Sequence, residues 1–224
     1  MAYKCILFDM DGTLVDSVHF HTLALQRFFQ LYHAQSYPYQ RLRSIMRRNF
    51  SEIFDALGID PALCDSYYHE KLPLFYEGQA DDLIAAHIVP NGDVLGTLQA
   101  LHQKGVRLGL ISNSKHELVA HTAQILGLTP YLEVVSGADN TYIDKLERCR
   151  IAVADMRLEP GDVLYVGDSE RDVEVSNELG FDSCYLRTPI SWAADDEYII
   201  HTLKPTMILG DIRDLNALKK RQRV

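Results

Sequence analysis

The sequence predicts an α/β protein in which a doubly wound, Rossmann-like parallel sheet forms a core and an all-helical cap domain is inserted into it. Three observations support this prediction. From about residue 88 onward, short apolar segments alternate with amphipathic helical segments. One apolar segment, Cys5–Phe8, stands far ahead of that alternation. The block between them has helical spacing of its apolar residues and no strand pattern.

The first strand is expected at residues 5–8. This apolar run ends at Asp9, and Gly12 follows as a turn signal. A short run that is apolar throughout is typical of a strand buried on both faces. The acidic residues that follow it should therefore lie in a loop at the carboxyl end of the strand.

The next block is predicted to be helical. Apolar side chains recur at helical spacing over residues 23–32, 45–57 and 61–77, with a break at residues 36–38 and a stop signal at Gly58. Residues 88–92 form a turn. We therefore predict a core domain of residues 1–15 and 88–224, and a helical cap domain of residues 16–87.

Beyond that turn, helices and strands alternate. Helices are expected at residues 94–104, 117–126, 145–155, 172–179 and 212–219, and strands at 107–111, 133–136, 163–166, 183–186 and 206–209. Helical stretches of about ten residues between strands imply parallel βαβ units. The carboxyl ends of the strands should thus share one edge of the sheet.

Composition narrows the class of protein. A chain of 224 residues is long enough for one α/β domain with a smaller insertion. Its formal net charge of -9 argues against nucleic acid or an anionic membrane as a partner. The basic residues 219–223 are interpreted as a solvated helix end. We expect no nucleic acid or membrane partner, and a monomer or homodimer.

The four cysteines are far apart and include no Cys-x-x-Cys pair, which predicts reduced thiols and neither a zinc site nor a disulfide framework. No apolar run has the pattern of a signal peptide or approaches the ~18 residues needed to span a bilayer. A cytoplasmic location is therefore expected.

The segment Asp9-Met10-Asp11-Gly12-Thr13 places two carboxylates at the predicted end of a strand, where open α/β sheets bind ligands. The alternative is an ordinary surface turn, since Asp-Gly is a common turn dipeptide. The apolar strand directly before it favours a functional pair. Average residue usage also makes such a match roughly a one-in-10⁵ event at each start position.

A second acidic motif follows the apolar run at residues 163–166. Gly167-Asp168-Ser169 stands at its end, and Asp172 comes four residues after Asp168. In a parallel sheet this loop can meet the Asp9 loop. The alternative is that Asp168 only caps the next helix.

Two further segments follow strands in the same order along the chain: Ser112-Asn113, and Lys145 at the start of a helix. With these four motifs the sequence resembles the haloacid dehalogenase superfamily over nearly its whole length, and within it phosphoglycolate phosphatases and β-phosphoglucomutases. The resemblance implies that Asp9 attacks phosphorus and forms an aspartyl-phosphate. It implies that Asp11 protonates the leaving oxygen and then activates water, for which nearby negative charge would raise its pKa.

The resemblance also implies the remaining roles. Ser112 and the amide of Asn113 would bind the transferring phosphoryl group, and Lys145 would balance the negative charge. Many relatives have Lys-Pro where this chain has Lys145-Leu146, so Lys115 is an alternative. Mg²⁺ would be bound by Asp9, the backbone carbonyl of Asp11 and Asp168, with Asp172 as an outer or helix N-terminal partner.

The cap would close over the site, contact the substrate and determine substrate specificity. His21 matches in spacing a hinge-region histidine of β-phosphoglucomutases, although His19 and His21 fit equally well as packed or solvent-facing helix residues. Of the basic residues at positions 41, 43, 47 and 48, Arg47 is the best candidate to bind a second anionic group. An exposed basic helix face is the alternative.

These inferences predict a magnesium-dependent phosphatase that acts on a small phosphorylated metabolite. The alternatives are a sugar-phosphate mutase and a non-enzymatic binding protein on the same scaffold. Gly167-Asp168-Ser169 follows the phosphatase-like pattern, whereas those mutases tend to have Glu-Asp at this place. Dehalogenation is disfavoured, because a halide leaving group needs no proton from Asp11.

Overall fold

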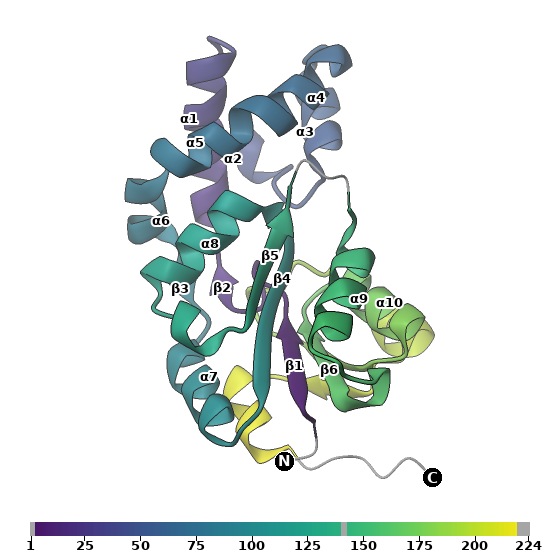
Figure 1. The fold of residues 1–224 in the computed structure, drawn as a ribbon. Helices are drawn as coiled ribbons and strands as arrows, with labels where there is room; N and C mark the ends of the chain where they lie inside the picture. Colours follow the sequence, from purple (N-terminus) through teal and green to yellow (C-terminus); the bar gives the residue numbers. More distant parts are fainter. Residues whose placement is uncertain (1–2, 140–142, 219–224) are drawn as a thin grey trace.

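A parallel sheet forms the centre of the structure. The computed structural model describes residues 3–139 and 143–218, and within them six strands pair in the order β5-β4-β1-β6-β7-β8 (Figure 1). Every neighbouring pair is parallel. The strands are β1 (Cys5–Phe8), β4 (Arg107–Lys115), β5 (Val134–Ala138), β6 (Val163–Gly167), β7 (Asp182–Leu186) and β8 (Met207–Leu209). In chain order this is 3-2-1-4-5-6, so the predicted doubly wound α/β fold is confirmed.

Helices cover both faces of the sheet. The covering helices are α7 (Val94–Gln103) and α8 (His116–Ile125) on one face, and α9 (Lys145–Asp155) and α10 (Glu170–Leu179) on the other. Ile6 and Phe8 of β1 belong to the core on the α7 and α8 side, whereas Cys5 and Leu7 belong to the core on the α9 side. All four are fully buried, which explains why this strand is apolar throughout.

The predicted helical block lies beyond the carboxyl ends of the central strands (Figure 1). It contains α1 (Val18–Tyr32), α2 (Tyr39–Arg43), α3 (Phe50–Leu57), α4 (Cys64–Ser66), α5 (Leu72–Gly78) and α6 (Asp81–His87). Two short antiparallel strands, β2 (Val15–Asp16) and β3 (Val89–Pro90), pair where the chain enters and leaves this block. The sequence did not predict this pair. The division into domains at residues 16 and 87 stays a prediction.

One predicted helix is shorter than expected. Ile45 and Met46, assigned to a helix over residues 45–57, instead lie in the turn between α2 and α3, although both are buried. The side chain of Asn49 accepts a hydrogen bond from the Glu52 N–H at 2.9 Å and caps α3. This cap fixes the start of the helix at Phe50.

The helical stretch at residues 61–77 is continuous but irregular. It runs from a 3₁₀ turn (Pro61–Leu63) through α4 and a π-helical turn (Tyr67–Lys71) into α5. Pro73 has no N–H and clashes with a helical carbonyl four residues back. The wider π turn, in which the Leu72 N–H bonds to the Tyr67 carbonyl, provides the extra room.

Other differences lie at the edges of the core. β4 runs to Lys115, four residues past its predicted end, and α8 begins directly after it. Residues 212–219 were predicted as a helix, but a 3₁₀ helix covers Ile212–Ala217, and the basic segment 219–223 lies outside the described residues. Between β7 and β8, where no element was predicted, lie α11 (Asp196–Tyr198) and a π-helical turn (Ile199–Leu203).

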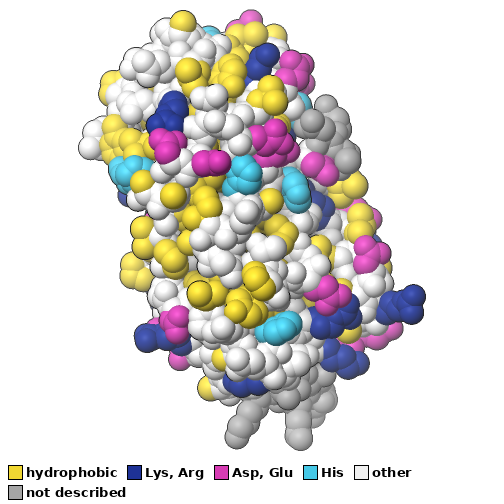
Figure 2. Space-filling view, turned by 60° about the vertical axis from the view of Figure 1, so that its left-hand side comes forward, with side chains coloured by type: hydrophobic (Ala, Val, Ile, Leu, Met, Phe, Trp, Pro, Cys, Tyr) yellow, Lys and Arg dark blue, Asp and Glu magenta, His cyan; other side chains and the backbone are white. Residues whose placement is uncertain are grey.

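The surface mixes side chains of every kind on the face that Figure 2 shows, where acidic, basic and hydrophobic groups are interspersed. Among the described residues, no helix has both the length and the apolar character that crossing a membrane requires.

The two faces of α7 provide a test of the packing. Leu98 is fully buried against the sheet and Leu95 is 43% exposed on the same helix. We expect Leu98→Ala to lower the free energy of unfolding by about 2–5 kcal/mol, because it leaves a cavity in the core. Leu95→Ala should change it by less than about 1 kcal/mol. Urea unfolding followed by circular dichroism measures both, and equal losses would contradict the described orientation of α7.

Candidate active site

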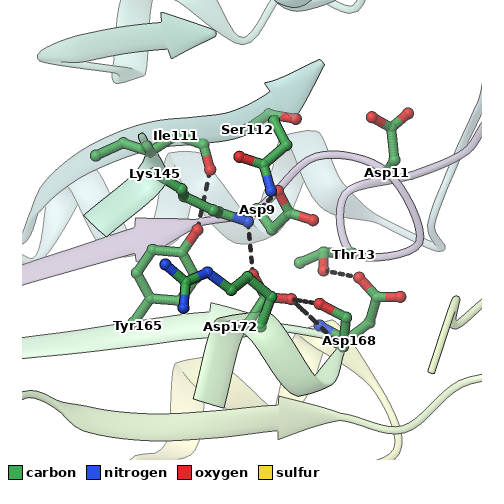
Figure 3. A network of polar contacts seen from close by, with 12 residues as sticks. Asp9, Asp11, Thr13, Ile111, Ser112, Lys145, Tyr165, Asp168 and Asp172 are labelled. Atoms are coloured by element: carbon green, nitrogen blue, oxygen red, sulfur yellow. Dashed lines mark hydrogen bonds and ion pairs between the residues drawn. The ribbon is translucent and has the colours of Figure 1, made fainter. Parts of the chain in front are cut away.

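The carboxyl ends of three neighbouring strands meet around β1. Asp9 directly follows β1, Ser112 lies near the end of β4, and Asp168 directly follows β6. Because β1 lies between β4 and β6, these residues, far apart in the sequence, become neighbours (Figure 3). The place is the switch point of a doubly wound sheet, where such folds bind ligands.

Lys145 connects two carboxylates at this point. Its Nζ donates to Asp9 Oδ1 at 2.8 Å and to Asp172 Oδ1 at 2.6 Å, and its side chain is 3% exposed. Burial opposes its protonation, but the charges of Asp172 and Asp9 hold the pKa of Lys145 well above its usual value. Of the two lysines considered from the sequence, Lys145 is the one that contacts Asp9.

Asp168 is fully buried and firmly oriented. Its Oδ1 accepts a hydrogen bond from Thr13 Oγ1 at 2.7 Å, and its Oδ2 accepts one from the Trp192 N–H at 2.5 Å. Gly12 adjoins it with a φ of +80°. A Cβ at Gly12 would lie 2.2 Å from Asp168 Oδ2, so this turn requires glycine for its backbone and for the space.

Asp172 uses both of its oxygens within the protein. Oδ1 accepts from Lys145, while Oδ2 accepts from the N–H of Asp168 at 3.1 Å and from the N–H and hydroxyl of Ser169 at 3.0 and 2.6 Å. The bond from the Ser169 N–H belongs to a capping box at the start of α10, in which the Ser169 side chain in turn accepts from the Asp172 N–H. This arrangement fits the helix N-terminal role predicted for Asp172 better than direct metal ligation.

The acidic cluster can hold a metal ion. Asp9, Asp168 and Asp172 each offer a carboxylate oxygen, and these atoms lie within 4.8 Å of one another. Burial raises the pKa of Asp9 to about 7 against the effect of Lys145. Burial, and then the charges of Asp172 and Asp9, raise the pKa of Asp168 well above its usual range. The three buried carboxylates exceed the single ammonium of Lys145 in charge, and the oxygens of Asp9 and Asp168 are the kind of ligand that a hard divalent cation prefers.

Asp11 does not join this cluster with its side chain (Figure 3). Its Oδ1 accepts from Ser17 Oγ at 2.5 Å and lies 3.0 Å from His21 Nε2, and its Oδ2 accepts from Ser114 Oγ at 2.5 Å. Burial raises the pKa of Asp11, but His21 and the two hydroxyls outweigh it, and the net pKa is lowered. The expected rise from nearby negative charge is thus wrong for this structure, because His21 and hydroxyl donors surround the carboxylate.

Arg148 forms hydrogen bonds with both Ser112 and Asn113. Its Nη2 donates to the Ser112 carbonyl at 2.8 Å and to Asn113 Oδ1 at 3.3 Å. Ser112 is buried and its Oγ accepts from the Ser114 N–H at 3.1 Å, whereas Asn113 is exposed. Sequence reasoning missed Arg148. Its signal was a charged residue three positions after Lys145, on the buried face of α9.

A cavity of about 840 Å³ opens above these groups. The predicted site residues that line it are Asp9, Asp11, His21, Arg47, Ser112, Asn113, Lys145 and Asp168. Of the two histidines considered from the sequence, only His21 belongs to this set. His19 packs instead against the rings of Tyr39 and His87.

Lys115 contributes a second cation to the cavity wall. It is 2% exposed, and its Nζ has no hydrogen-bond partner among residues 3–139 and 143–218. The ammonium lies 3.7 Å from the ring centroid of Tyr68, which belongs to the helical block. Burial lowers its pKa, partly offset by Glu117 and Asp139.

Several residues of the site had no role in the sequence prediction. Thr13, Ser17, Ser114 and Trp192 orient the two acidic side chains Asp11 and Asp168. Thr13 belongs to the first acidic motif, and Ser114 follows the predicted Ser112-Asn113 pair. Trp192 lies about 20 residues beyond the last motif and gave no signal.

Comparison with known proteins agrees with this geometry. Residues 6–186 match the model of the haloacid dehalogenase-like hydrolase family. The chain is 24% identical over 215 residues to the pyrophosphatase PpaX of Bacillus pumilus, covering 95% of this chain and 94% of that protein. It is 26% identical over 180 residues to the phosphoglycolate phosphatase of Aquifex aeolicus, covering 79% and 81%. A solved structure of a phosphatase from Clostridium difficile superposes with a TM-score of 0.79 at 18% identity, covering 97% and 98%, which shows the shared fold.

Gly12 permits a matched test of the site. Gly12→Ala introduces both a strained left-handed backbone and a clash with Asp168, whereas Gly58→Ala, at a φ of +68°, meets no atom within 4 Å. We expect Gly58→Ala to cost about 1–2 kcal/mol of stability from backbone strain alone. Gly12→Ala should cost at least about 1 kcal/mol more, because Asp168 must move. Chemical unfolding measures the difference, and equal costs would argue against the close approach of these loops.

Proposed function

The chain belongs to the haloacid dehalogenase-like hydrolase family, and from its site we propose that it is a magnesium-dependent phosphatase of a small phosphorylated metabolite that works through an aspartyl-phosphate on Asp9. The contact between Asp9 and Lys145, beside the buried Asp168 and at the base of a large cavity, carries this proposal. It joins a carboxylate nucleophile, a fixed cation and a set of metal-binding oxygens at one point.

Asp9 is positioned to act as the nucleophile. Lys145 holds its Oδ1, which fixes the orientation of the carboxylate. An Asp9 oxygen attacks phosphorus, the bond from phosphorus to the ester oxygen breaks, and the leaving oxygen takes a proton. Water then attacks the same phosphorus, which releases inorganic phosphate and restores the Asp9 carboxylate. Both steps need charge stabilisation of the phosphoryl oxygens.

The surrounding residues would supply that stabilisation. Ser112 and the amide of Asn113 would hydrogen-bond the phosphoryl oxygens, with Arg148 holding their backbone in place. Bound Mg²⁺, held by Asp9, Asp168 and the backbone carbonyl of Asp11, would neutralise negative charge on the phosphoryl group. Lys145, bonded to Asp9, provides a fixed positive charge in addition to the metal ion.

Asp11 is the proposed general acid and base. It lies two residues after the nucleophile, on the cavity wall, and its side chain is turned away from the metal cluster. Ser17, Ser114 and His21 hold it in that position. Asp11 would protonate the leaving oxygen from its carboxyl form and then, as a carboxylate, take a proton from the attacking water. The negative charge of a bound phosphoryl group would raise the pKa that His21 lowers.

The cavity favours a substrate that carries a second anionic group. Lys115 presents a buried ammonium without a hydrogen-bond partner among the described residues, and the exposed Arg47 lines the same cavity. A buried cation is costly until it is paired. Phosphoglycolate and pyrophosphate, named for the two curated relatives, each carry a second anionic group beside the phosphate that is cleaved.

A sugar-phosphate mutase is the second candidate. The bond between His21 and Asp11, at the entrance to the helical block, is the observation that favours it. A mutase would isomerise a hexose 1-phosphate and would need a bisphosphate activator. The assay for phosphatase activity should therefore include a hexose 1-phosphate, with and without its bisphosphate.

Removal of the nucleophile tests the proposed reaction. We expect Asp9→Asn to lower kcat by at least about 10³-fold, because the amide cannot form the acyl phosphate. Phosphate release from sugar, nucleotide and short-acid phosphates measures the effect, with Mg²⁺ and with a chelator. Asp65→Asn, an exposed change in α4, should retain activity. Turnover that survives both Asp9→Asn and the chelator would disprove the mechanism.

Replacement of Lys115 tests the second anionic group. Lys115→Met keeps the length of the side chain but removes its charge. It should lower kcat/KM by about 10–100-fold for phosphoglycolate or pyrophosphate, since a charge-assisted hydrogen bond is lost. A phosphate monoester without a second anion, such as para-nitrophenyl phosphate, should be affected less than about threefold. Lys71→Met, a lysine of the helical block outside the cavity lining, is the charge-matched control. Equal losses on both substrates would refute the assignment.

A further inference from the structure

The segment that follows β7 makes a second set of contacts with Asp168. Ser191 Oγ donates to the Asp168 carbonyl at 2.8 Å, and the Trp192 N–H donates to Asp168 Oδ2 at 2.5 Å. With Thr13 bonded to Oδ1, each carboxylate oxygen of Asp168 has a donor of its own. The side chain of Asp168 is therefore locked in one orientation.

The same segment is fastened at a second point. Glu170 Oε1 accepts hydrogen bonds from the N–H groups of Ala194 at 2.9 Å and Asp195 at 2.7 Å. Backbone donors at positions 192, 194 and 195 thus bind two carboxylates, Asp168 just after β6 and Glu170 at the start of α10. The two loops hold each other, and a shift of one would move the other.

The indole ring of Trp192 makes the remaining contacts. Its Cδ1 lies 2.9 Å from the place that a Cβ at Gly12 would occupy, so the ring lies directly against the turn after Asp9. Its centroid is 5.6 Å from that of His21, at an interplanar angle of 75°. Trp192 therefore touches the Asp9 loop and the first helix of the helical block while its backbone holds Asp168.

From these contacts we infer that Ser191 and Trp192 position the metal-binding carboxylate of Asp168 against the Asp9 loop. This inference rests on the proposed function in so far as Asp168 binds a metal. Groups that orient a metal ligand typically change metal affinity by about 10–100-fold when they are removed. Their effect comes from a carboxylate that is already in place when the ion arrives.

The test measures Mg²⁺ binding without any substrate, by isothermal titration calorimetry. Ser191→Ala removes the bond to the Asp168 carbonyl, and Trp192→Ala removes the ring that holds the segment against Gly12. Both should weaken Mg²⁺ binding by about tenfold or more. Trp192→Phe should stay within about threefold, because the indole Nε1 has no hydrogen-bond partner among the described residues and the phenyl ring keeps the packing.

Two controls separate positioning from a general loss of structure. Tyr198→Ala removes a 40% exposed aromatic side chain from α11, just beyond the segment, and should leave Mg²⁺ affinity unchanged. Trp192 is also the sole tryptophan of the sequence, so its fluorescence reports directly on this site. Mg²⁺ should change the emission of the native protein but not that of Asp168→Asn.

The outcomes are distinct. The inference would be supported if the native protein binds Mg²⁺, Ser191→Ala and Trp192→Ala bind it more weakly, and Trp192→Phe binds it about as well as the native protein. Equal Mg²⁺ affinity in the native protein and in all three variants would overturn the positioning role and leave the proposed phosphatase standing. Absence of Mg²⁺ binding by the native protein would overturn both the inference and the metal dependence on which it rests.

Discussion

The site depends on an excess of negative charge that the fold buries at the carboxyl end of β1. Asp9, Asp168 and Asp172 lie close together, and Lys145 is the cation that bonds directly to two of them. Carboxylates in such surroundings repel one another and lose the solvation of water, which is why the pKa values of Asp9 and Asp168 are raised. Lys145, Thr13 and the Trp192 N–H donate to these carboxylates, and a bound divalent cation would complete the charge balance.

The strand order makes this concentration of charge geometrically possible. Because β1 lies between β4 and β6, short loops from three strands reach one point without long connections. Gly12 allows the first loop to approach Asp168 closely, and Trp192 contacts both Gly12 and Asp168. The rigid sheet thus sets the spacing of groups whose chemistry tolerates little displacement.

Two buried lysines line the cavity in different surroundings. Lys145 bonds to carboxylates, whereas Lys115 lies over the ring of Tyr68 and lacks a hydrogen-bond partner among the described residues. The first lysine balances charge that the protein itself supplies. In the proposed function, the second would bind charge that a substrate brings.

The sequence by itself determined the α/β class, the parallel sheet and the acidic residues Asp9, Asp11 and Asp168, because strand periodicity and motifs at strand ends are local patterns. It could not foresee that His21, Ser17 and Ser114 would surround Asp11 and lower its pKa, since His21 lies in α1, Ser17 directly before α1, and Ser114 in β4. It favoured Lys145 over Lys115 but could not exclude Lys115, and it could not find Trp192. Those outcomes depend on which loops meet in space, and only the tertiary structure decides that.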